Sequence, residues 1–117
     1  MKLVPLGVAI LALAAGPALA QTAFGDDGGC ARVRGEAPQG DMVFILWPDR
    51  VERWESSCDI VATERLDAAS VLLRTECSGE GETWEQRYVM APLPDGAGFV
   101  IGPEEYPDVR FEVRLCQ

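Results

Sequence analysis

Four cysteines constrain this chain more than any other feature of its sequence: Cys30, Cys58, Cys77 and Cys116. An even number of cysteines in a short exported chain is typical of a disulfide framework, and four cysteines allow three pairings. The spacing favours Cys58–Cys77 with Cys30–Cys116, because residues 58–77 form a predicted hairpin around Asp67-Ala68-Ala69 that sets its two cysteines opposite each other. Chain-entropy estimates give about 3 kcal/mol for the shorter loop and about 4 to 5 kcal/mol for the longer one.

The N-terminal segment predicts export. It begins with Met1-Lys2, continues with an almost unbroken apolar run over residues 3–15 and ends in the small-x-small triplet Ala18-Leu19-Ala20. This layout is typical of a bacterial Sec-type signal peptide cleaved after Ala20. Residue 21 is Gln rather than Cys, so the site lacks the acceptor for a lipid anchor. We expect a periplasmic or secreted protein with a signal peptide over residues 1–20, a flexible lead-in over residues 21–29 and a disulfide-stabilised β-domain over residues 30–117.

Composition argues against several classes of function. Removing residues 1–20 from the 117 leaves 97 residues, enough for one domain, with nine Arg against nineteen Asp and Glu and therefore a formal charge of −10. This charge argues against binding to nucleic acid or to anionic lipid, both of which depend on Lys and Arg. The chain has no His, and Lys2 is its sole Lys, so we expect neither a His-based nucleophile pair nor a lysine Schiff base. We expect no enzymatic activity, no cofactor, no metal and no membrane insertion of the mature chain.

Hydrophobic patterning predicts an all-β domain. Residues 42–47 form a continuous apolar run bounded by Gly40 and Pro48, which is typical of a buried strand. Strand-like segments recur about every ten to fifteen residues, with turn signals such as Pro94-Asp95-Gly96 between them. This spacing predicts a small antiparallel meander or barrel of six to seven strands, tied by two disulfides. The strand-like segments are 30–33, 42–47, 51–58, 60–66, 70–77, 83–90, 99–101 and 109–115.

Two of these segments carry more detailed expectations. Residues 62–69 also suit a short helix by propensity, although too few apolar residues recur there at helical spacing. The last strand shows the clearest alternation in the chain, so Val109, Phe111, Val113 and Leu115 are expected to face inward.

The segment from Cys77 to Trp84, Cys-Ser-Gly-Glu-Gly-Glu-Thr-Trp, is the most distinctive local feature. Its glycines allow positive φ beside Glu80 and Glu82, so the two carboxylates could converge on a cation or on an Arg of a partner. We favour the simpler interpretation of a solvated hairpin loop whose acidic residues serve solubility. Calcium requires six to eight oxygen ligands, and this spacing lacks the Asp/Asn series of an EF-hand. Paired carboxylates also serve glycosidases, but a domain of this size seldom offers the necessary cleft.

Three tryptophans, Trp47, Trp54 and Trp84, are many for so short a chain. Trp54 and Trp84 lie within strand-like segments and are expected to pack in the core. Trp47 precedes Pro48 at a turn and is expected to be the most exposed of the three. An exposed Trp beside acidic residues would suit a binding surface. The candidate partner-binding residues are therefore Glu80, Glu82, Trp84 and Trp47.

Two short segments also resemble a known group of proteins. Residues 54–60, Trp-Glu-Ser-Ser-Cys-Asp-Ile, and residues 76–84, Glu-Cys-Ser-Gly-Glu-Gly-Glu-Thr-Trp, resemble small exported proteins of alphaproteobacteria that carry a Cys-x-Gly-Glu-Gly segment. The resemblance covers about thirty residues and implies a small periplasmic β-domain without an associated activity. Periplasmic C-type lysozyme inhibitors share the small size and a cysteine near the C-terminus, but their Ser-Gly-x-x-Tyr and Phe-Trp-x-Lys-Gly elements are absent from this chain.

Together these features predict an exported, non-enzymatic β-domain that binds a protein partner. The acidic charge favours a basic partner, because complementary charge speeds encounter. An inhibitor of a cationic wall-lytic enzyme is the most specific form of this hypothesis. The alternative is a protein that binds a small molecule or a divalent ion with the barrel mouth and the Glu80–Glu82 loop.

Overall fold

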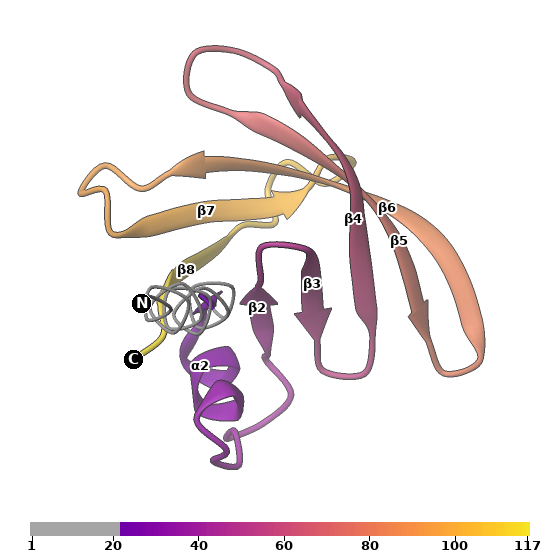
Figure 1. The fold of residues 1–117 in the computed structure, drawn as a ribbon, viewed down its shortest axis with the longest axis vertical. Coiled ribbons are helices and arrows are strands. Elements are labelled where there is room, and N and C mark those ends of the chain that lie inside the picture. The colour runs from indigo at the N-terminus through magenta and orange to yellow at the C-terminus, as the bar shows by residue number, and fades with distance from the viewer. Residues whose placement is uncertain (1–21) are drawn as a thin grey trace, which may run out of the picture.

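The computed structural model describes residues 22–117, so the predicted signal peptide lies outside the described residues. These residues form an all-β fold, in which eight antiparallel strands close into a barrel (Figure 1). Each strand pairs with its neighbours in sequence, and β8 pairs with β1 to close the barrel. The elements are β1 (Phe24–Gly25), α2 (Asp27–Val33), β2 (Phe44–Leu46), β3 (Arg50–Arg53), β4 (Ser57–Arg65), β5 (Val71–Gly79), β6 (Glu82–Pro92), β7 (Gly98–Pro103) and β8 (Phe111–Leu115).

The eight strands slightly exceed the expected six to seven, and two segments differ from their predictions. The segment 21–29, expected as a flexible lead-in, supplies β1 from its described part, and β1 pairs with β2 on one side and with β8 on the other. Residues 51–58, expected as one strand, contain a reversal in which the Arg53 N–H donates to the carbonyl of Ser56 (2.8 Å). That reversal ends β3 and starts β4.

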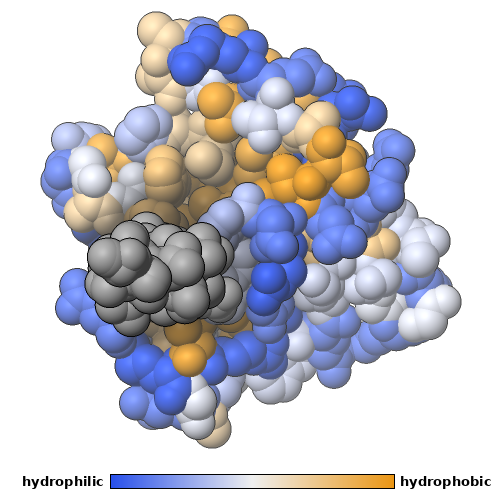
Figure 2. Space-filling view, viewed as in Figure 1, coloured by the Kyte–Doolittle hydropathy of each residue, from blue (hydrophilic) through white to orange (hydrophobic). Residues whose placement is uncertain are grey.

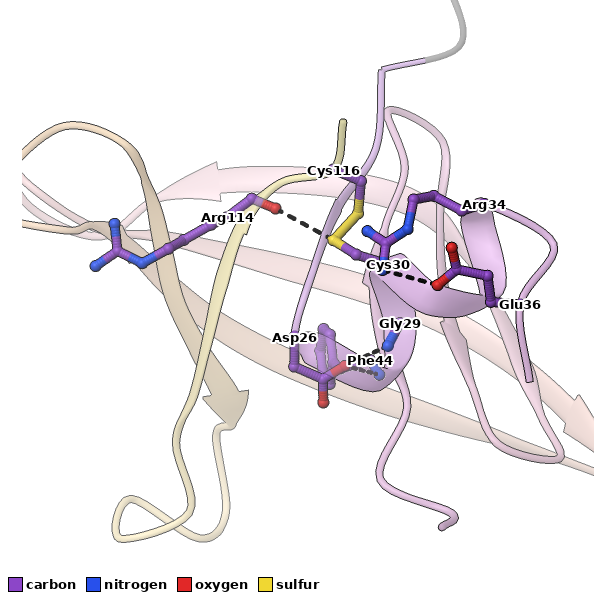
Figure 3. Close-up of a disulfide and its surroundings, with 8 residues drawn as sticks. All are labelled: Asp26, Gly29, Cys30, Arg34, Glu36, Phe44, Arg114 and Cys116. Carbon is purple, nitrogen blue, oxygen red and sulfur yellow. Dashed lines mark hydrogen bonds and ion pairs between the residues drawn. A yellow bond between two sulfur atoms is a disulfide. The ribbon is translucent and has the colours of Figure 1, made fainter. Parts of the chain in front are cut away.

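The segment 30–33, predicted as a strand, belongs instead to helix α2. The carboxylate of Asp26 caps this helix and accepts hydrogen bonds from the backbone N–H of Gly29 (2.7 Å) and of Phe44 (3.0 Å), as Figure 3 shows. A Cβ on Gly29 would clash with the carbonyl oxygen of Phe44. The glycine therefore lets the helix pack directly on the backbone of β2, a tertiary requirement that local propensity does not reveal.

Both disulfides have the pairing that the spacing favoured. Cys30–Cys116 joins α2 to the residue that follows β8 (Figure 3). Cys58–Cys77 links directly opposed positions of β4 and β5, and both cysteines are buried. Two disulfides are compatible with a periplasmic or extracellular location. Among residues 22–117, no helix is long and apolar enough to cross a membrane.

The core fills the middle of the barrel. Phe44, Val51, Ile101 and Val113 are fully buried there, and Phe44 meets the ring of Tyr88 edge to face at 5.8 Å. The inward positions follow the two-residue period of each strand, which places alternate side chains on opposite faces of a sheet. The core therefore separates the two open ends of the barrel.

The predicted hairpin of residues 60–77 is confirmed as β4 and β5, and residues 62–65 are strand rather than the alternative helix. The last strand is confirmed only in part. Val113 is fully buried and Phe111 is partly buried against the core. Val109 precedes β8 and Leu115 ends it, and both side chains are exposed. Alternation predicts which side chains of a strand point inward, but it does not predict where the strand extends beyond the core.

Candidate functional site at the mouths of the barrel

The predicted site residues Glu80, Glu82 and Trp84 lie together at one mouth of the barrel. Glu80 and Gly81 form the tight turn between β5 and β6, with positive φ at both residues (51° and 80°). Positive φ at both central residues matches the twist of a two-residue hairpin. Glu80 is the one non-glycine residue with positive φ among those described. Strain of this kind is often found at functional sites.

The turn between β3 and β4 packs against this turn and brings further carboxylates. A Cβ on Gly79 would clash with the carbonyl oxygen of Glu55, so glycine allows the two turns to touch. The two turns and Asp41 line a pocket of about 430 Å³, which we call the acidic mouth. Its charged and aromatic lining residues are Asp41, Arg53, Trp54, Glu55, Glu80, Glu82, Trp84 and Tyr88.

Negative charges accumulate at the acidic mouth. A hydrogen bond with Glu80 and the charge of Glu80 raise the pKa of Glu55 above its ordinary value, with smaller contributions from burial and from Asp41. Within residues 22–117, none of Asp41, Glu55, Glu80 and Glu82 forms an ion pair with an Arg. The same range holds no group of three or more His, Cys, Asp or Glu that could bind a metal ion. An arriving cation would replace repulsion between these carboxylates with attraction.

Arg53 is the one cationic side chain among the described residues that line the acidic mouth, and the sequence analysis did not identify it. Its Nε donates a hydrogen bond to the carbonyl of Val43 (3.1 Å), and its guanidinium carbon lies 4.8 Å from the rings of both Phe44 and Phe111. Burial raises the pKa of the Tyr88 hydroxyl, and the nearby Arg53 opposes that shift. A signal was present, because Arg53 lies two residues after Val51 and therefore shares its inward face.

The prediction of which tryptophans are exposed was wrong. Trp54 and Trp84, expected in the core, are 41% and 39% exposed and line the acidic mouth. Trp84 pairs with the inward-facing Cys77, but it occupies a position near the turn, where the barrel opens. Trp47, expected to be the most exposed, packs against a second apolar cluster, and its Nε1 donates to Glu52 (3.0 Å).

Trp47 also lies apart from the other three predicted site residues. It lines a pocket of about 390 Å³ at the other end of the barrel, which we call the apolar mouth. In Figure 2, hydrophobic surface gathers in the upper half of the view, in the hollow between the β4–β5 hairpin and β7. The lining residues are Thr22, Phe24, Leu46, Trp47, Pro48, Ile60, Thr63, Val71, Leu73, Met90 and Phe99. None of these belongs to the acidic mouth, so the barrel offers two separate candidate sites.

The comparisons with known proteins add no functional inference. Family models, curated proteins and solved structures show no match to this chain. The resemblance of residues 54–60 and 76–84 to small exported proteins therefore stays a prediction, and the candidate site rests on its own geometry.

Proposed function

We propose that this chain is an exported, non-enzymatic binding protein whose acidic mouth holds a basic protein partner. The observation that carries the proposal is the pair of neighbouring carboxylates Glu55 and Glu80, which form no ion pair within the described residues, beside two half-exposed tryptophans. A cationic side chain is the group that this arrangement would hold best. Inhibition of a cationic wall-lytic enzyme is the most specific form of the proposal.

The chemistry of the acidic mouth suits an Arg or Lys side chain of the partner. The carboxylates of Glu55 and Glu80 would accept charge-assisted hydrogen bonds from its head group. The rings of Trp54 and Trp84 would contact its aliphatic stem and add cation–π attraction. Arg32 already stacks on Trp54 at 5.2 Å, so a guanidinium fits one face of that ring. Trp is also the residue type most enriched at binding hot spots.

Long-range charge supports the same class of partner. The expected mature chain carries nineteen acidic side chains against nine Arg. Such a field raises the rate of encounter with a cationic surface, and salt screens it over about 10 Å at ordinary ionic strength. Binding through the acidic mouth should therefore weaken markedly as salt rises.

The proposal is tested by capture of a partner on the immobilised protein at low and at physiological salt. The test variant is Glu55→Gln/Glu80→Gln/Glu82→Gln. The matched control is Asp59→Asn/Glu76→Gln/Glu85→Gln, which removes the same number of charges from a row of opposed, exposed residues on β4, β5 and β6. We expect wild type and control to retain a basic protein that elutes with salt, and the test variant to lose it.

Two results would contradict the proposal. Equal retention by the test variant would remove the acidic mouth from the interface. Loss of binding in the control variant alone would move the site to the outer face of β4–β6. Assay of the captured protein for wall-lytic activity, with and without added domain, then tests the inhibitor form of the proposal separately.

A further inference from the structure

The apolar mouth is a feature of the barrel that the proposed partner binding does not use. Its lining comes from β1, β2, β4, β5, β6 and β7 and from the turn after β2, so most of the barrel circumference encloses it. Eight-stranded barrels have interiors that side chains just fill or that hold one small ligand. Here the rings of Phe44, Tyr88 and Phe111 fill the centre, and the pocket occupies the mouth beyond them.

A β-bulge shapes one wall of this pocket. The register between β4 and β5 shifts between Ile60 and Ala62. Because the extra residue reverses the alternation, Ile60 and Thr63 both line the pocket although they are three residues apart. Bulges of this kind commonly re-aim side chains toward a site.

The chemistry of the lining specifies an uncharged ligand. Among residues 22–117, no charged side chain lines the apolar mouth, and Thr22 and Thr63 bring hydroxyl groups to it. The indole N–H of Trp47 is already used, because it donates to Glu52. Several lining residues pack on the core with one side only partly buried: Phe24, Ile60, Val71, Met90 and Phe99. A hydrocarbon ligand would remove this apolar surface from water.

The volume of the pocket and the arrangement of its aromatic rings further restrict the class of ligand. At the packing density of protein interiors, a volume of about 390 Å³ holds roughly 15 carbon atoms, fewer than a sterol or a two-chain lipid contains. Phe24 and Phe99 meet edge to face, with ring planes at 75°, so they offer no parallel faces to sandwich a planar ring. The guanidinium of Arg50 already lies 4.7 Å from the ring of Trp47. A single flexible chain fits such a wall better than a rigid ring system.

We propose that the apolar mouth binds the hydrocarbon tail of a single-chain amphiphile and leaves the head group outside the barrel. A free fatty acid, a fatty alcohol and a one-chain phospholipid share this tail. The site is independent of the acidic mouth, so its ligand and a basic partner can be bound together.

The test is a calorimetric titration with straight-chain alcohols, octanol, decanol and dodecanol, kept below the concentration at which they aggregate. The protein is expressed with its own N-terminal segment and purified with both disulfides formed. We expect one binding site, an affinity that rises about fourfold per added methylene, and little change with salt. Dodecanoate and dodecylphosphocholine should bind within a few-fold of dodecanol. Absence of binding to the folded protein, dependence on one head group, or tighter binding of 1-naphthol would overturn the proposal.

Variants place the ligand in the pocket. Thr63 is exposed and lines the apolar mouth, so Thr63→Phe fills the pocket without altering the core. Glu64→Phe adds the same ring at the next residue, which is exposed and lies outside the lining. We expect Thr63→Phe to weaken dodecanol binding at least tenfold and Glu64→Phe to leave it unchanged. Met90→Gln, which places an amide in the part of the lining that β6 supplies, should weaken binding as well. Unchanged binding in both Thr63→Phe and Met90→Gln would put the ligand elsewhere.

Two controls distinguish a ligand in the apolar mouth from an effect of the acidic mouth or of the N-terminal segment. The Glu55→Gln/Glu80→Gln/Glu82→Gln variant should bind dodecanol as wild type does, so the two proposals can fail independently. Mass spectrometry of the purified protein shows whether residues 1–20 are still attached. If dodecanol binds only after their removal, residues 1–20 compete with it, and the amphiphile proposal holds for the cleaved chain; if dodecanol binds neither form, the proposal is wrong.

Discussion

The two mouths of the barrel share strands β4, β5 and β6 and differ in their chemistry. β5 supplies Val71 at one end and Gly79 at the other, and β6 supplies Met90 at one end and Trp84 at the other. Within the described part of the chain, four carboxylates line one pocket, whereas no charged side chain lines the other. The net charge of the chain therefore agrees with the acidic mouth, but it gives no indication of the apolar mouth.

The two mouths also differ in how they are held. Cys58 lines the acidic mouth, and its disulfide with Cys77 ties β4 to β5 at that end. The apolar mouth is held by packing, such as the contact between Phe24 and Phe99 at 5.2 Å. Covalent restraint at one end and side-chain packing at the other should respond differently to mutation.

The largest expected effects come from the disulfides. Removing Cys30–Cys116, which closes 86 residues of sequence, should lower the free energy of unfolding by about 4 to 5 kcal/mol and loosen both mouths. The Cys58→Ala/Cys77→Ala variant should lose about 3 kcal/mol and weaken partner binding, while hydrocarbon binding persists. Denaturant unfolding and the two binding assays measure these effects. Loss of hydrocarbon binding in Cys58→Ala/Cys77→Ala, with partner binding retained, would contradict this difference between the two ends.

Replacing one aromatic residue by Ala at each end of the barrel should lower the free energy of unfolding by different amounts. Phe99→Ala removes a ring that packs on the core, so we expect a loss of about 2 kcal/mol. Trp84→Ala removes a larger ring, but that ring is 39% exposed, so the loss should be smaller, about 1 kcal/mol. Thermal and denaturant melts of both variants provide the measurement. Equal losses would mean that the acidic mouth is packed as tightly as the apolar one.

The positive φ of Glu80 in the turn of the acidic mouth should lower the stability of the fold while it places the carboxylate for partner binding. Glu80→Gly relieves a positive φ and should raise the free energy of unfolding by about 1 kcal/mol while it lowers partner affinity. Gly81→Ala is the converse control: no atom lies near its added Cβ, but φ is 80°, so a loss of about 1 kcal/mol is expected. A destabilised Glu80→Gly variant would show that the glutamate side chain stabilises the turn.

The smallest effects concern pH. Hydrogen bonds from the backbone N–H of Ala97 and from Arg114 lower the pKa of Asp95, so its stabilisation is present above its unfolded pKa of about 3.9 and is lost as pH falls through the folded pKa. The pKa of Glu55 is raised, so the sign is opposite: protonation relieves repulsion, and stability decreases as pH rises through the folded pKa.

We therefore expect Glu55→Gln to melt slightly above wild type at pH 7, with the difference vanishing in acid below the unfolded pKa of glutamate. Asp95→Asn should melt below wild type at pH 7, with that difference also shrinking in acid. Melting curves across this pH range test both signs. A Glu55→Gln variant that melts below wild type at pH 7 would contradict the repulsion at the acidic mouth.

Much of the fold was predictable, because hairpins are specified locally. The Asp67-Ala68-Ala69 turn, the β-strand patterning of β4 and β5 and the pairing of Cys58 with Cys77 all follow from residues that are close in sequence. The carboxylate turn at Glu80 and Glu82 was also identified, although its placement beside Glu55 was not. That contact depends on Gly79, whose role appears only when another turn packs on its backbone.

The errors share a physical cause, which is tertiary context. Helix α2 contains Gly28 and Gly29, which disfavour a helix locally but allow it to lie on the backbone of Met42 and Phe44. Trp54 and Trp84 look like core residues, yet the barrel opens before it can bury them. The apolar mouth has no local signature, because its lining is drawn from six strands spread over most of the domain.

If the two mouths are separate sites, they bind chemically different ligands independently. A titration of the protein with a basic wall-lytic enzyme, a lysozyme, tests this at low and at physiological salt, each with and without saturating dodecanol. We predict that both ligands bind, that neither changes the affinity of the other by more than about twofold, and that only the enzyme is released by salt. Competition between enzyme and dodecanol, or loss of both by the Glu55→Gln/Glu80→Gln/Glu82→Gln variant, would contradict the independence of the two mouths.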